Sequence, residues 1–245
     1  MSVDRNITKP PVNKLLAALP ASEYERLVPH MKHVPLSFNR ILYEPKEPIT
    51  HVYFPHHSVV SIITTMEDGS TVEAGLISNE GMAGIPVILG GKTTTTTAMV
   101  QIPNGATQIN ADVIKSEFNR GGVLQKLLLQ YVQARYSEVT QGLACNRLHT
   151  IEERLARWLL TITDRLQTED FQLTQEFIAQ MLGVRRSGVT LAASTLSRAG
   201  MIRYNRGHIN ILNREAMEET SCECYRVIRD EFARLLNNSP GSNFG

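Results

Sequence analysis

The segment TQEFIAQMLGVRRSGVTLAASTL, residues 174–196, constrains the fold more than any other feature of this chain. Thr174 is a typical N-cap for a first helix, and Gly183 suits a tight turn after it. A second helix is predicted from about Arg185 to Ala199. The expected buried positions of the two helices are Phe177 or Ile178, Met181, Leu182, Val189, Ala192, Ala193 and Leu196. Two short helices joined by a tight turn form a helix-turn-helix.

Arginine is concentrated on and after the second helix. Residues 185–214 include six arginines and no Asp or Glu, a local charge of +6 in a chain whose net charge is only +1. Such a stretch is typical of a surface that contacts phosphates, and the second helix of a helix-turn-helix enters the major groove. The predicted DNA contacts are Thr174, Arg185, Arg186, Ser187, Thr190, Arg203 and Arg206.

Individual roles follow from side-chain chemistry. Arg186 is our first choice for reading a base, because the guanidinium fork can bond guanine O6 and N7. Arg185, Ser187 and Thr190 are alternatives for base contact, and each could bind a phosphate instead. Thr174, at a helix N-terminus, suits a phosphate.

The residues after the second helix predict a wing. MIRYNRGHINIL, residues 201–212, resembles two short strands joined at Asn205-Arg206-Gly207, where Asn and Gly suit a turn with positive φ. Arg203 and Arg206 would then lie over the DNA backbone. A final helix is expected from about Arg214 to Leu236, with Cys222 and Cys224 on different faces.

The first half of the chain has a different pattern. Short β-rich runs follow one another between Val34 and about Ile109, with turn signals at a spacing of about 8 to 12 residues. This pattern is typical of an antiparallel sandwich or barrel-like roll. A Thr-x-x-Glu capping box at Thr150 and Glu153 starts a separate helix that runs to Leu166.

A long helix is predicted between the two parts, from after Gly122 to about Asn146. At about 1.5 Å per residue it is longer than one small domain needs, so we expect it to pair with a second copy. The alternative is a long core helix within one chain. The predicted dimer contacts are Leu124, Leu128, Tyr131, Val132, Val139 and Leu143.

The predicted fold class is therefore α+β: an N-terminal antiparallel β-roll, a long dimerisation helix and a C-terminal winged helix-turn-helix. The expected domains are a sensor domain at residues 1–120, the dimerisation helix at 121–148 and the DNA-binding domain at 149–245.

This arrangement resembles the Crp/Fnr superfamily over about residues 12–236. The most specific segments are IEERLARWLL, from Ile151, and the helix-turn-helix segment itself. The resemblance implies a homodimer that binds inverted-repeat operators and touches RNA polymerase. It also implies that Arg186 is the principal base-contacting arginine.

The resemblance does not extend to the effector. Members that bind cyclic nucleotides carry a Glu and an Arg where this chain has Met82 and Thr96. A buried cyclic phosphate would lose its charge-assisted bonds without that arginine, so we expect no cyclic AMP binding and no cofactor. A cyclic-nucleotide- or haem-responsive regulator of the same fold is the alternative. His51, His56 and His57 are the available haem ligands, although a solvent-facing loop accounts for them more simply.

The three cysteines, Cys145, Cys222 and Cys224, predict no metal site. Their number leaves one unpaired, and the C-x-C pair has no other Cys or His near it in the sequence. We therefore expect free, reduced thiols. An oxygen-sensing cluster of the Fnr type is not expected, because no cysteine precedes residue 145.

Enzyme and membrane motifs are missing from the sequence. It has no Gly-x-Ser-x-Gly, phosphate loop, His-Glu-x-x-His or dinucleotide-binding glycine pattern, so we expect no enzyme. No apolar run approaches the ~18 residues of a membrane span, and the first residues do not resemble a signal peptide. A cytoplasmic protein is the expectation.

Overall fold

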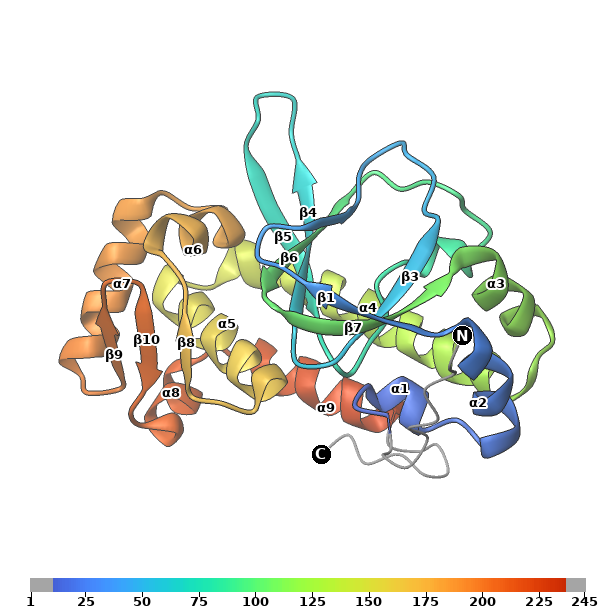
Figure 1. Ribbon diagram of the computed structural model, residues 1–245. Helices are drawn as coiled ribbons and strands as arrows, with labels where there is room; N and C mark the ends of the chain where they lie inside the picture. Colours follow the sequence, from blue (N-terminus) through green and yellow to red (C-terminus); the bar gives the residue numbers. More distant parts are fainter. Residues whose placement is uncertain (1–10, 237–245) are drawn as a thin grey trace.

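The computed structural model describes residues 11–236, and Figure 1 shows two unequal lobes along one long helix. The larger lobe is built on two antiparallel sheets, with strand orders β1-β7-β3 and β2-β6-β4-β5. The predicted antiparallel roll and the α+β class are confirmed. The strands are β1 (Lys32–Leu36), β2 (Ile41–Tyr43), β3 (His51–Pro55), β4 (Val59–Thr65), β5 (Thr71–Ile77), β6 (Thr97–Ile102) and β7 (Asn104–Asn110).

Short helices cover one end of the roll. They are α1 (Lys14–Ala17), α2 (Ala21–Leu27), η1 (Val28–His30), η2 (Ile85–Val87) and α3 (Ala111–Asn119). Asn13 caps α1, and its amide also donates to the carbonyl oxygens of Pro55 and Gly81 at 3.0 and 2.9 Å. This buried side chain thereby ties the first helix to two turns of the roll.

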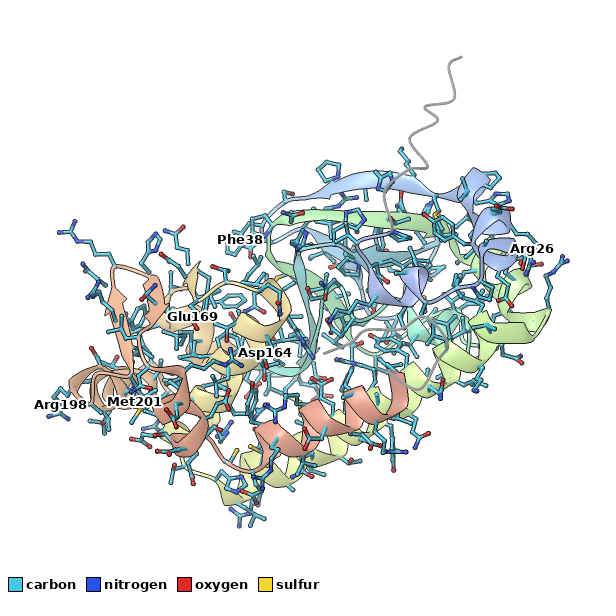
Figure 2. The ribbon with its side chains drawn as sticks, turned by 90° about the horizontal axis from the view of Figure 1, so that it is seen from below. Arg26, Phe38, Asp164, Glu169, Arg198 and Met201 are labelled. Atoms are coloured by element: carbon cyan, nitrogen blue, oxygen red, sulfur yellow. The ribbon has the colours of Figure 1, made fainter. Side chains whose placement is uncertain are left out.

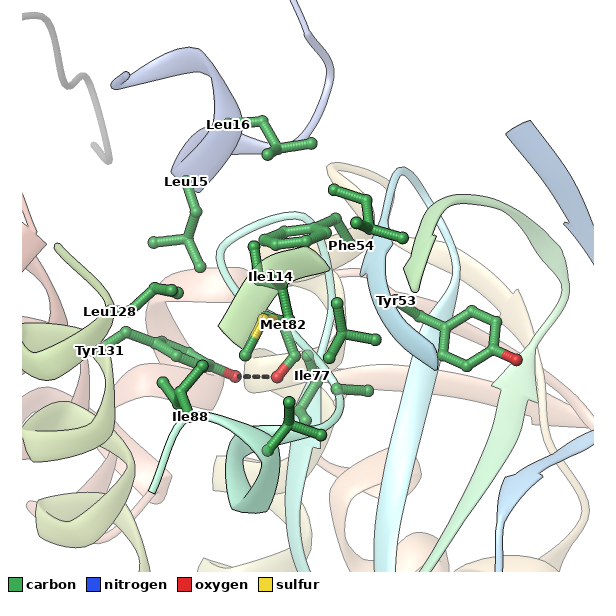
Figure 3. Close-up of a cluster of buried hydrophobic side chains, with 14 of the residues drawn as sticks. Leu15, Leu16, Tyr53, Phe54, Ile77, Met82, Ile88, Ile114, Leu128 and Tyr131 are labelled. Carbon is green, nitrogen blue, oxygen red and sulfur yellow. Dashed lines mark hydrogen bonds between the residues drawn. The ribbon is translucent and has the colours of Figure 1, made fainter. Parts of the chain in front are cut away.

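The long helix α4 (Gly122–Leu148) begins against the roll. The Glu23 carboxylate accepts hydrogen bonds from the amides of Val123 and Leu124, at 2.9 and 2.8 Å, and so caps the helix. Figure 3 shows Tyr131 among the buried side chains of the roll, where its hydroxyl donates to the Met82 carbonyl oxygen at 3.3 Å. The first half of α4 is therefore part of the roll's own core.

This packing contradicts three of the six predicted dimer contacts. Leu124, Leu128 and Tyr131 are buried against the roll of their own chain, so their assignment to a dimer interface is wrong. A simple three-to-four periodicity could not tell the inward face from the outward face. Val132 is partly buried at the edge of the core, whereas Val139 and Leu143 are exposed as a dimer contact requires.

The smaller lobe is a winged helix-turn-helix. Its elements are α5 (Ile151–Leu166), β8 (Asp170–Gln172), α6 (Gln175–Leu182), α7 (Arg186–Arg198), β9 (Ile202–Asn205), β10 (His208–Ile211), α8 (Arg214–Thr220) and α9 (Cys224–Leu236). The capping box at Thr150 and Glu153 is confirmed at the start of α5. The predicted single final helix is wrong: the chain leaves the helix at Ser221 and resumes it at Cys224, giving α8 and α9.

The two lobes share their cores. Figure 2 shows α9 lying along α4, and Leu235 and Leu236 at the end of α9 are buried in the core of the roll. In the other direction, Val59, Ile63 and Leu76 from β4 and β5 are buried in the core of the smaller lobe. The predicted domain boundaries at residues 120 and 148 remain a proposal. Each of the two hydrophobic cores contains residues from both sides of these boundaries.

Candidate nucleic-acid interface

The helix-turn-helix is built as its sequence predicts. The Thr174 hydroxyl accepts a hydrogen bond from the Phe177 amide at 3.2 Å and caps α6. Gly183 follows α6 at a φ of 63°, a conformation that favours glycine. Arg185 is the N-cap residue of α7, and its side chain is exposed.

The predicted DNA contacts of α6 and α7 lie on the surface. Thr174, Arg185, Arg186, Ser187 and Thr190 are all exposed, while Val189, Ala192, Ala193 and Leu196 form the buried face of α7. Of the two alternatives in the first helix, Ile178 is buried and Phe177 is only partly so. The start of α7 thus exposes two arginines and two hydroxyl side chains.

Besides Thr174, the side chains of Arg186 and Thr190 have partners within the protein. The Arg186 Nε lies 3.9 Å from a Glu176 carboxylate oxygen, and the Arg186 side chain is 67% exposed. A surface ion pair of this length contributes little, so the guanidinium can leave it for a base. The Thr190 hydroxyl donates to Gln175 Oε1 at 2.8 Å, which orients this threonine within the surface.

Sequence reasoning missed three residues of the same surface. Leu191 and Ser194 are exposed on α7, and Gln175 is half-buried beside Thr190. An exposed leucine on a recognition helix can contact a thymine methyl group, and a serine or glutamine can bond base edges. Of the three, only Leu191 could have been found from the sequence, because it is an apolar residue that lies outside the buried stripe of α7.

The wing is a two-residue hairpin. His208 pairs with Asn205, so the connecting residues are Arg206 and Gly207, which have φ values of 49° and 84°. We expected positive φ at Asn205, and this detail is wrong because Asn205 still belongs to β9. Arg203 and Arg206 are exposed, as a role over the phosphate backbone requires, and β10 also pairs with β8.

Figure 2 shows the two ends of the molecule. Arg198, at the C-terminal end of α7, is at one tip, and Arg26 of the sensor lobe is at the opposite end. The basic start of α7 is at the other end of that helix and lies beside the β4–β5 hairpin of the roll, because Arg185 and Arg186 line one pocket with Ser70 and Val72.

A buried polar contact connects the roll to the DNA-binding lobe. Glu73 on β5 accepts hydrogen bonds from Trp158 Nε1 at 2.9 Å and from the Ser61 hydroxyl at 2.8 Å. Trp158 belongs to α5, which supports the helix-turn-helix. The bond therefore connects α5 to the sheet of the roll.

A second buried network joins α4, α5 and the turn after β5. Arg165 on α5 contacts Glu80 at 3.3 Å and Glu138 at 3.2 Å, and Glu138 also pairs with Arg135. All four side chains are largely shielded from water, so removal of one partner would leave an uncompensated buried charge. A change at this turn of the roll is thus coupled to α5.

Burial raises the pKa of Glu73 to about 7, against the opposing effect of its bonds with Trp158 and Ser61. The folded protein therefore keeps a proton that the unfolded chain loses near the ordinary value of 4.5. Folding stability from this group is complete below that value and falls as the pH rises to about 7. Glu73→Gln is expected to remove this loss, which is on the order of 3 kcal/mol.

Urea unfolding at pH 5 and pH 8 measures this effect. The free energy of unfolding should fall more between the two values in the unaltered protein than in the Glu73→Gln variant. Glu67→Gln, an exposed change on the same hairpin, is the matched control and should behave like the unaltered protein. Equal pH dependence in all three proteins would show that Glu73 is not held protonated.

The two positions considered for cyclic-nucleotide binding, Met82 and Thr96, make contacts within the roll. Met82 is fully buried in the core, and the Thr96 and Thr94 hydroxyls are 3.0 Å apart. Gly81 lies directly against the Tyr131 hydroxyl, which comes from α4. This corner of the roll is packed against the long helix (Figure 3).

The histidines considered as haem ligands are engaged locally. His51 Nδ1 lies 3.0 Å from the Thr50 hydroxyl, and His56 Nε2 lies 3.0 Å from the Thr107 hydroxyl. Burial lowers the pKa of His56, and the neighbouring His33 and His57 add to this effect. Within residues 11–236 these histidines join no group of three or more metal-binding side chains.

The cysteines differ from their predicted arrangement. The turn between α8 and α9 brings Cys222 and Cys224 to the same place rather than to different faces, and Cys145 and His149 lie beside them. The C-x-C pair therefore has Cys and His neighbours in the fold, although none lies near it in the sequence. Cys145 is 77 residues away in the chain from Cys222, and the sequence alone could not bring them together.

The comparisons with known proteins agree with this geometry. Residues 153–220 match the model of the Crp-like helix-turn-helix domain. The chain is similar to the structure of a transcriptional regulator of the Crp/Fnr family from Eubacterium rectale, with a TM-score of 0.66 and 16% identity over 85% of this chain and 98% of the other. FixK2 from Bradyrhizobium japonicum gives a TM-score of 0.69 with 17% identity over 78% of this chain and 98% of its own.

A third similar structure is the c-di-GMP responsive global regulator CLP of Xanthomonas campestris, with a TM-score of 0.63 and 14% identity over 78% of this chain and 99% of the other. At such identities the likeness shows the shared fold. No curated protein sequence matches the chain. Among the helices of residues 11–236, none is long and apolar enough to cross a membrane.

Proposed function

We propose that this chain, a transcription regulator of the Crp/Fnr type with a helix-turn-helix DNA-binding domain, acts as a homodimer that reads a palindromic operator. The observation that carries the proposal is the exposed basic start of α7 within the Crp-like domain, residues 153–220. Because the partner is DNA, we place the protein in the cytoplasm. Control of transcription through contact with RNA polymerase is part of the same proposal.

The outer face of α4 supports the dimer. A stripe of apolar side chains follows the helix at alternating steps of three and four, and we call it the α4 stripe: Leu129, Val132, Tyr136, Val139 and Leu143. Tyr136 and Leu143 are 71% and 75% exposed in the single chain. This spacing is that of the a and d positions of a coiled coil, which bury such side chains against a second helix. Two copies joined here would carry two recognition helices.

The two-fold symmetry of such a dimer determines the symmetry and spacing of its operator. A two-fold dimer of this kind contacts two half-sites about one helical turn, or ~34 Å, apart. The operator is therefore expected to be an inverted repeat. Arg186 reads a base in each half-site, Arg185, Ser187 and Thr190 contact bases or phosphates beside it, and Thr174 and the wing hold the backbone.

We propose that the roll responds to an effector other than cyclic AMP, or to none. Met82 and Thr96 provide no charge for a cyclic phosphate, and the packing of Tyr131 against Gly81 supports this reading. Calorimetry with cyclic AMP tests it, and a micromolar affinity would contradict it. The same titration with haem tests the alternative sensor.

Arg206→Ala in the wing is expected to weaken binding to all DNA sequences alike. Arg206 is exposed at the hairpin tip, and we assign it to a phosphate of the DNA backbone. The loss should reduce the slope of log K against log salt by about 1. Titration of operator and random duplexes at several salt concentrations measures both effects. A loss confined to the operator would mean that Arg206 reads sequence.

Sedimentation and DNA titration test the proposed function together. The free protein is expected to sediment as a dimer, and two chains should bind one palindromic duplex. A monomer that binds single half-sites with full affinity would contradict the dimeric reader.

A further inference from the structure

Four metal-binding side chains meet where α4 ends and α9 begins. Cys145 lies in the last turn of α4, and His149 follows that helix directly. Cys222 lies in the turn after α8, and Cys224 is the first residue of α9. One potential ligand atom from each of the four lies within 4.8 Å of the others, although the two pairs are far apart in the sequence.

The distances fit ligands around one ion. The Cys145 and Cys222 sulfurs are 3.5 Å apart, and the Cys224 sulfur is 3.6 Å from His149 Nδ1. Tetrahedral zinc, with Zn–S bonds of about 2.3 Å, places its ligand sulfurs about 3.8 Å apart. A cluster of several iron atoms would separate its thiolates further, because they bind different irons. The spacing therefore favours a single ion.

The neighbouring side chains resemble the outer shell of a metal site. A Glu223 carboxylate oxygen lies 3.2 Å from His149 Nε2, which turns Nδ1 toward the cysteines. A carboxylate behind the imidazole is the usual support of a metal-bound histidine. Gln141 Nε2 donates to the Cys224 sulfur at 3.1 Å, and such a donor stabilises a thiolate.

The burial of the cysteines and the arginines beside them also suit a metal site. All three cysteines are buried, and together they form a small core of their own. Three thiolates and one divalent ion sum to −1, which a neighbouring arginine can balance. Arg154 and Arg157 of α5 are the cations whose charges act on the cysteines.

We propose that Cys145, His149, Cys222 and Cys224 bind one tetrahedral zinc ion. The thiol protons pass to the solvent as the ion binds, and no electron is transferred. The ion would join the end of the long helix and the start of α5 to the α8–α9 turn. It would thereby hold the DNA-binding lobe at a fixed angle to α4. A shared ion also gives a reason why side chains from two distant segments of the chain meet at this point.

Elemental analysis of the full-length protein, purified under reducing conditions without added metal, tests the site. We expect about one zinc per chain. Replacement by Co²⁺ should give the visible bands of a tetrahedral ion and an ultraviolet thiolate-to-cobalt band, with saturation at about one equivalent. Cys222→Ser and Cys145→Ser should each weaken Co²⁺ affinity by at least about tenfold. His208→Ala, on the exposed wing, is the control and should leave it unchanged.

The unaltered protein makes the proposal falsifiable even if a cysteine variant fails to fold. Less than about one ion in ten chains, together with no thiolate-to-cobalt band in the reduced protein, would overturn the site. An iron–sulfur spectrum would overturn the single ion, and a Cys145–Cys222 disulfide that persists under reducing conditions would replace it. None of these measurements contains DNA, so their outcome is separate from that of the proposed function.

Discussion

Arg186→Ala is expected to weaken binding to the operator by about 5- to 150-fold, or about 1 to 3 kcal/mol, and to relax the base preference at one position of each half-site. The reason is the loss of the guanidinium fork from an exposed position at the start of α7. Fluorescence titration of operator and random duplexes at one salt concentration measures the change.

Two further variants make this test specific. Arg198→Ala removes the same charge from the other end of α7, where the side chain is exposed, and is expected to have a much smaller effect. Arg186→Lys retains the charge but not the fork, so it should resemble Arg186→Ala in base preference. Equal losses on operator and random DNA for Arg186→Ala would mean that this arginine contacts only phosphates.

The double change Tyr136→Glu and Leu143→Glu is expected to convert the dimer into monomers and to reduce operator affinity by at least about 100-fold at nanomolar protein. The two side chains are largely exposed in the single chain, so the fold should tolerate the change. In a two-fold dimer it would bring like charges together at positions that otherwise bury apolar surface. Sedimentation velocity and circular dichroism measure assembly and fold separately.

Leu89→Glu is the matched control for the dimer. Leu89 is also a large exposed apolar residue, but it belongs to the loop after η2 and not to α4. This variant should remain dimeric and bind DNA normally. A dimer that persists after the double change would place the interface elsewhere than on the α4 stripe.

The local parts of the fold were predictable because their signals are local. Thr150 with Glu153, Thr174 and Gly183 each determine a cap or a turn through the chemistry of one or two residues. The roll followed from short strands between turns. The exposed basic start of α7 was predictable too, because the missing acids and the buried stripe of Val189 and Leu196 lie within one helix.

The long-range parts were not predictable. Tyr131 and Leu143 belong to the same apolar pattern on α4, but only the fold shows that one faces the roll and the other faces outward. The cysteine cluster depends on a break of the last helix at Ser221 and on the packing of α9 along α4. Neither event has a signature in the spacing of the cysteines themselves.

Selection of bound sequences from random duplex DNA, with the purified protein at near-physiological salt and no added ligand, tests the central claim most directly. We predict enrichment of a two-fold inverted repeat with half-sites about one helical turn apart, lost in the Tyr136→Glu, Leu143→Glu variant. Enrichment of a single, unrepeated half-site, or of no sequence from either the free protein or the protein with candidate effectors, would contradict a dimeric reader of operator DNA.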